Sequence, residues 1–239
     1  MEVYEYSFDQ IEKLADEQNL KYDPTRLKEL KPMDVYDYAE KILGITFDWK
    51  YLTPTRKIDG VTFFTDCTYW VWPCSFNTKI EPLPSKEELL EKYKPYEIDI
   101  KANTIIIDQY ILDERDDYKE KFTVAHECGH YVCHPKGFSV TSCEAWEPYE
   151  YGSFKKMTPA QKHERHANHF AAALLMPRDI IFKTFQTLFN SDIFSGRSEN
   201  DRILGIIQVM ADKCKASAES MSYRLIDLEI ISKVRRNVV

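Results

Sequence analysis

Residues 122–130 read Phe122-Thr-Val-Ala-His-Glu-Cys-Gly-His130 and contain the motif H-E-x-x-H. An α-helix turns by about 100° per residue, so His126 and His130 lie one turn apart on the same face. Both imidazoles can therefore reach one metal ion, and Glu127 lies where it can contact a metal-bound water without being a ligand. The alternative is a surface helix with two ordinary histidines. The strand-like run 104–108, just before this helix, favours the metal site.

A catalytic zinc site needs a third protein ligand and an open position. The next predicted helix, 158–176, has a capping box at Thr158 and Gln161 and is stopped by Pro177. This helix supplies four candidate ligands, namely His163, Glu164, His166 and His169. Spacing places Glu164 at the inward edge of the helix but leaves the three histidines as alternatives.

Two blocks of the chain resemble the ImmA/IrrE family of metallopeptidases. The first is the run 122–130, and the second is Glu164-Arg-His-Ala-Asn-His-Phe-Ala-Ala-Ala-Leu-Leu-Met-Pro177. The family shows F-T-x-A-H-E-x-G-H and then E-x-x-A-N-x-F-A-A-x-L-L-M-P. The resemblance implies one Zn²⁺ per chain, held by His126, His130 and Glu164, with Glu127 as the catalytic base. It also implies a zinc-dependent endopeptidase, bacterial or phage-related, which cleaves a helix-turn-helix repressor or antitoxin and so triggers a stress or mobile-element response.

Several neighbouring side chains are candidates for supporting roles. Tyr131 and His134 follow the motif and are possible oxyanion stabilisers. Asn168 is expected to orient Glu164 or a ligand histidine. Cys128, about 200° round the helix from His126, is expected to be a buried thiol. Once Glu164 is the third ligand, we expect His163, His166 and His169 at the surface, and a second zinc site from Cys133, His134 and Cys143 lacks an obvious fourth ligand.

The order of elements predicts an α+β fold, in which a small twisted sheet accompanies a helical zincin-like core and a C-terminal helix-turn-helix-like segment. We expect an N-terminal helix and linker at 1–31, a metallopeptidase domain at 32–190 with an insertion at about 65–95, and a helical segment at 191–239. Asp59-Gly60 predicts a β-hairpin, and an extended substrate is expected to pair with the sheet edge near 104–108. The helix that carries the motif is predicted at 118–132, and other helices are predicted at 8–19, 32–44, 86–94, 178–190, 201–214 and 218–228.

The run 209–225 resembles the C-terminal helical segment of the same family. A helix-turn-helix can enter a DNA groove, but the second helix here carries Arg224 as its one base, beside Glu219. We therefore expect this segment to serve packing. The alternative function is a DNA-binding regulator, or a toxin–antitoxin component, with a zinc site that is not used for proteolysis.

Composition limits the partners of the chain. Its 239 residues carry a net charge of −7, whereas nucleic-acid binding needs clustered Lys and Arg. Residues 1–10 lack signal-peptide features, and the longest apolar run, 170–176, is far below the roughly 18 residues that span a bilayer. Six cysteines without a C-x-x-C pair fit a reducing compartment. We therefore expect a cytoplasmic protein with a protein substrate, no direct nucleic-acid contact and no membrane contact.

Overall fold

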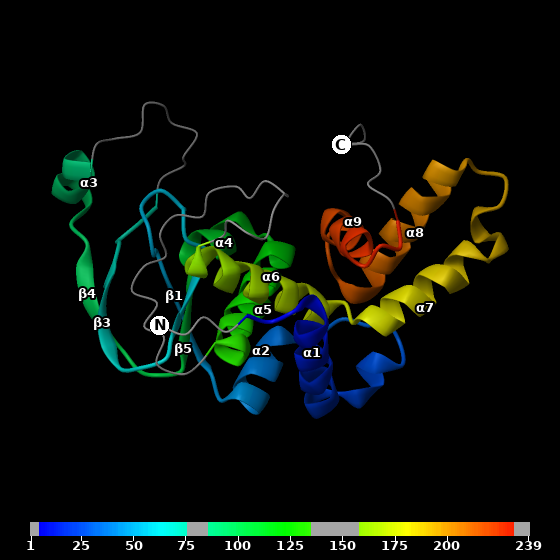
Figure 1. Ribbon diagram of the computed structural model, residues 1–239. Coiled ribbons are helices and arrows are strands. Elements are labelled where there is room, and N and C mark those ends of the chain that lie inside the picture. The colour runs from blue at the N-terminus through cyan, green and yellow to red at the C-terminus, as the bar shows by residue number, and fades with distance from the viewer. Residues whose placement is uncertain (1–4, 76–85, 135–157, 232–239) are drawn as a thin grey trace. The chain divides into compact units, whose positions relative to one another are not determined.

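The computed structural model describes residues 5–75, 86–134 and 158–231 (Figure 1). The described chain divides into two compact units, which are treated separately below. The first comprises Glu5 and the described residues within Val35–Asn168, and the second those within Tyr6–Asp34 and His169–Val239. Helix α6 (Pro159–Leu175) begins in the first unit and ends in the second. The domain boundaries predicted after residues 31 and 190 were based on sequence motifs, and they stay a proposal.

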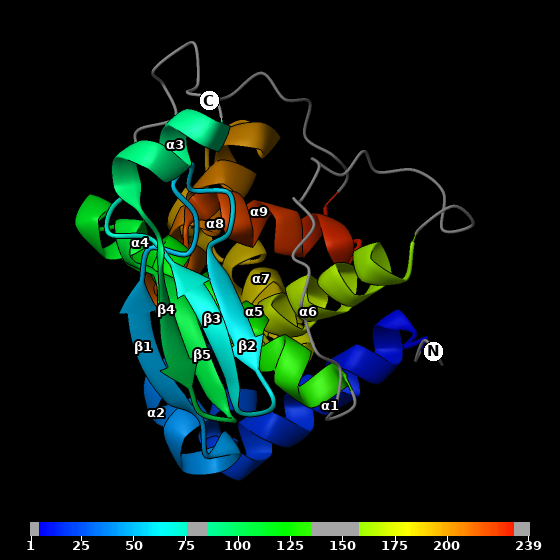
Figure 2. The same cartoon turned by 90° about the vertical axis from the view of Figure 1, so that its left-hand side faces the viewer.

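A three-stranded sheet forms the centre of the first unit. Its strands are β1 (Thr46–Lys50), β5 (Thr104–Asp108) and β2 (Gly60–Phe63), in the order β1-β5-β2 (Figure 2). Strand β1 is parallel to β5 and β2 is antiparallel to it. All five residues of β5 are buried. The expectation of a substrate-pairing edge near 104–108 is therefore wrong, because β5 is paired on both sides.

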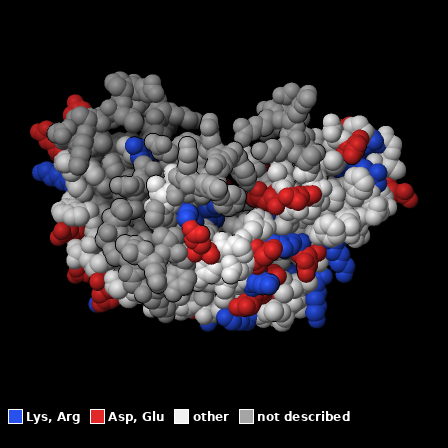
Figure 3. Space-filling model, viewed as in Figure 1, with Lys and Arg blue, Asp and Glu red and all other residues white. Residues whose placement is uncertain are grey.

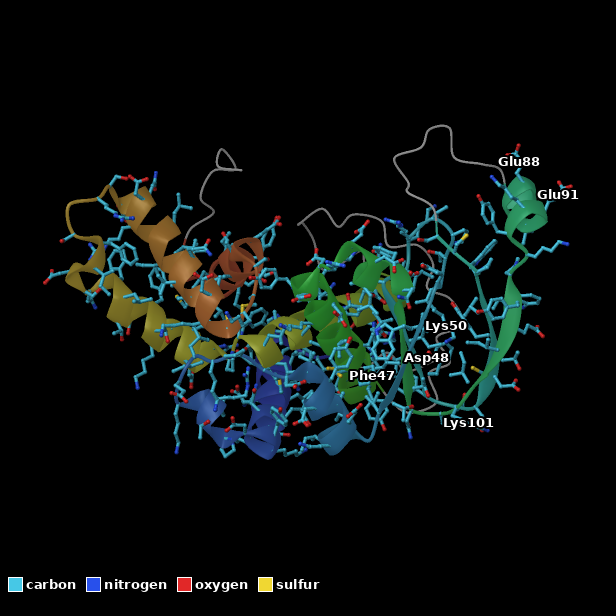
Figure 4. All side chains as sticks on the ribbon, turned by 180° about the vertical axis from the view of Figure 1, so that it is seen from behind. Phe47, Asp48, Lys50, Glu88, Glu91 and Lys101 are labelled. Atoms are coloured by element: carbon cyan, nitrogen blue, oxygen red, sulfur yellow. The ribbon has the colours of Figure 1, made fainter. Side chains whose placement is uncertain are left out.

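A two-stranded layer packs on this sheet, with one strand in the predicted insertion and the other just after it. Strands β3 (Cys67–Val71) and β4 (Tyr96–Ile100) pair antiparallel, and α3 (Lys86–Tyr93) lies between them in sequence. The inner residues of this pair pack against the central sheet in one apolar cluster: Cys67, Tyr69, Ile98 and Ile100 with Val61, Phe63 and Ile106. The exposed Glu88 and Glu91 of α3 point away from the sheet (Figure 4). The inner faces of β3 and β4 thus serve packing.

The predicted hairpin at Asp59-Gly60 is wrong. Gly60 begins β2, which pairs with β5 (Gly60 opposite Ile107) rather than with residues just before it. A Cβ atom at position 60 would lie 3.0 Å from Cγ and Oε1 of Glu127 and 3.0 Å from Cγ2 of Thr123. The glycine is therefore explained by the close approach of β2 to a helix, not by a turn.

That helix is α5 (Asp117–Cys133), which covers the face of the central sheet opposite to β3 and β4 (Figure 1). A short helix that the sequence pattern did not predict, α4 (Gln109–Glu114), connects β5 to α5 and is capped by the buried side chain of Asp108. Helix α2 (Val35–Tyr38) continues into a π-helical turn (Ala39–Leu43) that ends at Gly44 with φ 67°. Cys128 is fully buried, as predicted.

The second unit is helical. It contains α1 (Phe8–Tyr22), α7 (Arg178–Phe189), α8 (Glu199–Cys214) and α9 (Ala218–Asp227), with short 3₁₀ turns at Pro24–Leu27 and Asp192–Phe194. These helices match the predicted ranges within a few residues. Their apolar faces share one core: Met176, Ile181, Phe185, Phe194, Ile206, Ile207, Met210, Ala211, Cys214, Met221, Leu225 and Ile231.

The mixed α+β fold with C-terminal helices is therefore confirmed. The capping box predicted at the start of α6 is present: the Thr158 N–H donates to Gln161 (2.9 Å), and the Gln161 N–H donates to Thr158 (3.2 Å). Among the helices of the described residues, none is both long enough and apolar enough to cross a membrane.

Candidate metal centre

Helix α5 places His126 and His130 on the same face, with their Nε2 atoms 3.0 Å apart. Glu164, from the first half of α6, reaches both rings. Its Oε2 lies 3.2 Å from Nε2 of His126, and its Oε1 lies 3.3 Å from Nε2 of His130. Tetrahedral zinc with ligands at about 2.0–2.1 Å separates its donor atoms by about 3.3 Å. The two nitrogens and the carboxylate therefore fit one zinc ion in both spacing and chemistry.

A second carboxylate, that of Glu127, also lies close to the two histidines. One donor atom each from His126, Glu127 and His130 lies within 4.8 Å of the others. The contacts of the two glutamates differ, however. Glu127 accepts a hydrogen bond of 2.7 Å at Oε2 from the hydroxyl of Thr62, whereas Glu164 contacts both imidazoles. The geometry thus favours Glu164 as the third ligand, and it leaves Glu127 beside the metal position.

Burial and charge act in opposite directions at this group. Burial alone would raise the pKa of Glu164, but its contacts with His126 and His130 outweigh burial and hold that pKa well below its usual range. Burial alone would lower the pKa of His126, but the contact with Glu164 and the charge of Glu127 raise it overall. Glu164 is therefore a charged carboxylate at neutral pH, as a metal ligand must be.

The outer nitrogen of each ring is also held. Nδ1 of His126 lies 2.9 Å from Oδ1 of Asn168, which is one of the contacts proposed for this asparagine. Nδ1 of His130 lies 3.1 Å from Nδ1 of His134. Burial, followed by the charges of His130 and His163, lowers the pKa of His134 to about 2. The ring of His134 is therefore neutral at physiological pH.

The two candidate oxyanion stabilisers have other contacts. The hydroxyl of Tyr131 donates to Oδ1 of Asn103 (3.2 Å), and its ring stacks on Phe64 at 5.9 Å. His134 contacts the Nδ1 side of His130, whereas the facing nitrogen and carboxylate atoms lie on the Nε2 side. Neither contact directs these side chains toward a substrate carbonyl, and an oxyanion role for either residue stays a prediction.

The remaining histidines of α6 do not lie where the sequence predicted. His163 and His166 are buried, because their rings pack near that of His134, at 4.3 and 5.9 Å between centroids. His169 belongs to the second unit, where its Nε2 lies 2.8 Å from Oε1 of Glu12. The expectation of three surface histidines is wrong. Cys133 is buried, and Cys143 lies outside the described residues.

Sequence reasoning missed Thr62, which approaches Glu127 from β2. In a strand, alternate residues face the same side. Gly60 and Thr62 therefore both face α5, while Val61 and Phe63 face the layer of β3 and β4. The Gly-x-Thr pattern could have indicated a strand face that packs closely against a helix. It does not indicate which helix that would be.

A histidine pair and two glutamates lie together in a small α+β unit, and this arrangement suits a metal centre. The sequence pattern of the peptidase M78 family, described as the IrrE N-terminal-like domain, matches residues 77–225, and the chain belongs to this family. The resemblance to the ImmA/IrrE family is therefore confirmed. A comparison with curated proteins finds no match.

Proposed function

We propose that this chain is a zinc-dependent endopeptidase in which His126, His130 and Glu164 hold the metal and Glu127 is the general base. The observation that carries the proposal is the convergence of three donor groups from two helices, with separations of 3.0, 3.2 and 3.3 Å. Membership in a peptidase family supports the reaction type. The carboxylate of Glu164 and the two imidazoles suit zinc, which prefers N and O donors in such catalytic sites.

When bound, zinc would polarise the scissile carbonyl and acidify the attacking water. Glu127 would take the proton of this water and pass it to the leaving amine. Thr62 holds Oε2 of Glu127, so the second oxygen, Oε1, is the one assigned to proton transfer. Asn168 would fix the ring of His126 through Nδ1, so that Nε2 keeps its lone pair for the metal.

For the substrate, we propose a cytoplasmic helix-turn-helix repressor or antitoxin. The support is the resemblance to a family whose members cleave such proteins, together with the net charge of −7. A DNA-binding surface of a repressor is basic, because it must neutralise phosphates. An acidic protease is therefore suited to approach the repressor rather than its operator.

The contacts of Arg224 argue against the DNA-binding alternative. Arg224, the one base of the predicted second helix of a helix-turn-helix, is only 1% exposed. Its guanidinium donates to both carboxylate oxygens of Glu12 (2.6 and 2.9 Å) and to the carbonyl of Met176 (3.0 Å). On the face shown in Figure 3, basic and acidic side chains of the described residues are interspersed. Arg224 therefore serves packing, as expected from the sequence.

The test uses the zinc-loaded protein and candidate helix-turn-helix repressors or antitoxins, taken first from the genes beside its own. We expect mass spectrometry to find one discrete cut, which a chelator abolishes and added zinc restores. The matched control is Glu127→Gln, which should bind zinc but leave the repressor intact. Intact repressor with the wild-type protein at every zinc concentration would contradict the proposal.

A further inference from the structure

Both ring nitrogens of His130 have polar neighbours. Nε2 faces Nε2 of His126 at 3.0 Å and Oε1 of Glu164 at 3.3 Å. Nδ1 faces Nδ1 of His134 at 3.1 Å. The contact between His130 and His134 joins two nitrogens of the same kind, so its direction depends on which ring carries the proton.

The metal position decides this direction. A neutral imidazole has one N–H and one lone pair, and a metal ligand must offer the lone pair to the ion. If His130 binds through Nε2, its proton is on Nδ1 and is donated to Nδ1 of His134. His134 then carries its own proton on Nε2. With the opposite direction, the proton of His130 would occupy Nε2 and block the metal position.

We propose that His134 is a positioning residue for the metal: its Nδ1 accepts the Nδ1–H of His130 and thereby directs the Nε2 lone pair of His130 toward the ion. The inference rests on the metal site of the proposed function, but it does not depend on proteolysis. It gives His134 a role different from oxyanion stabilisation. It also makes the site symmetrical, since Oδ1 of Asn168 holds Nδ1 of His126 in the same way.

The surroundings of His134 hold its ring in place. His134 is the C-cap residue of α5, and its backbone N–H donates to the carbonyl of His130 (3.1 Å), which keeps the two residues close together. The residue is 4% exposed, and the rings of His163 and His166 pack around it at 4.3 and 5.9 Å. A packed ring holds its hydrogen bond in one geometry, which is what a ligand-orienting contact requires.

The first experiment measures zinc affinity by competition with a chromogenic chelator, with no substrate present. For His134→Leu, which removes the acceptor, we expect affinity to fall by roughly 10- to 100-fold, the usual effect of losing such a partner. For His134→Asn, whose Oδ1 can occupy the place of Nδ1, we expect affinity close to wild type. His163→Asn loosens the packing around His134 but keeps the acceptor, so its affinity should fall less than that of His134→Leu.

The second experiment needs no variant. Long-range ¹H–¹⁵N spectra of the zinc-loaded wild type should show His130 protonated on Nδ1 and His134 protonated on Nε2. His134 protonated on Nδ1, or unchanged zinc affinity in a folded His134→Leu variant, would overturn the inference. If His134→Leu does not fold, the tautomers seen in the wild-type spectra decide whether the inference holds.

The outcomes for the two proposals are separable. A wild type that binds zinc with the expected tautomers but cleaves no repressor refutes the proposed substrate and leaves the role of His134 intact. A wild type that cleaves its substrate but shows the opposite tautomers refutes the role of His134 alone. A wild type that binds no zinc refutes both.

Discussion

The hydroxyl of Thr62 lies 2.7 Å from Oε2 of Glu127 and 3.1 Å from the backbone carbonyl oxygen of the same residue. Both side chains are buried, at 3% and 5% exposure. Strand β2 thus contacts the proposed general base directly, and it does so through a side chain that can donate one hydrogen bond. A base held in one orientation needs no rearrangement before proton transfer.

Replacing Thr62 by Val removes this hydroxyl at nearly constant volume. We expect kcat to fall on the order of tenfold. This is less than the roughly 10²- to 10⁴-fold rate enhancement that a general base supplies, because Glu127 itself is still present. KM and zinc content should stay unchanged, because the hydroxyl touches neither a proposed metal ligand nor the metal position. Steady-state kinetics with a cleavable peptide test this. Thr62→Ser should recover most of kcat, and a Thr62→Val enzyme as active as wild type would contradict the role of the hydroxyl.

Gly60→Ala tests the close approach of β2 to α5. The added Cβ would lie 3.0 Å from Cγ and Oε1 of Glu127, so the glutamate side chain must shift. Since this side chain can move, we expect a stability cost of only about 1 kcal/mol in urea unfolding, at the low end for overpacking. We expect kcat to be affected more strongly than stability, because the shifted group is the proposed general base. Zinc binding should persist. Full activity would show that the position of Glu127 is not critical.

The second unit should show a pH-dependent stability from Asp16. Burial, followed by the charges of Glu12 and Asp179, raises the pKa of Asp16 to about 6. The folded state then binds a proton more tightly than the unfolded state, so this group lowers stability as the pH rises from about 4 to 6. We expect Asp16→Asn to stabilise the protein at pH 7 by about 1 kcal/mol, a discounted value because water screens the half-buried group.

Chemical unfolding of wild type and Asp16→Asn at pH 3 and pH 7 measures this effect. At pH 3 the carboxyl is protonated in both the folded and the unfolded state, so the two proteins should be equally stable there. A stability difference that does not change between the two pH values would exclude the titration of Asp16 as its cause.

The buried pair of Arg224 and Glu12 is expected to matter more for stability than any exposed ion pair. Arg224→Met leaves the carboxylate of Glu12 buried without its bidentate partner, which typically costs about 3–5 kcal/mol. The double variant Glu12→Leu with Arg224→Met removes both charges and should be the more stable of the two variants. Denaturant unfolding distinguishes them. A double variant less stable than Arg224→Met would show that the pair is not the cause.

The sequence predicted those parts of the site that depend on local periodicity. The 3.6-residue repeat placed His126 and His130 on one face, and the capping box at Thr158 marked the start of α6. The contact between Thr62 and Glu127 joins residues 65 positions apart, and no local pattern specifies such a pairing. Asp59-Gly60 was misinterpreted for the same reason. A glycine can mark either a turn or a close contact between the backbone and another element, and only the pairing of β2 with β5 shows which of the two applies here.

The burial of His163 and His166 was also missed for a physical reason. A polar residue on a helix is expected at the surface unless it finds a partner, and their neighbour His134 follows the end of a different helix, α5. The family resemblance was needed to choose Glu164 among four candidates, because helical spacing alone placed all four near the metal position. The structure adds that Glu164 contacts both histidines of the motif.

The central claim is that three side chains from two helices hold one zinc ion, and metal content tests it most directly. Wild type, Glu164→Gln and Glu127→Gln should be purified with equal zinc exposure and measured by atomic emission spectroscopy. We predict one zinc per chain for wild type and for Glu127→Gln, and a large loss for Glu164→Gln. Equal zinc in all three proteins, or none in wild type, would contradict the assigned ligands.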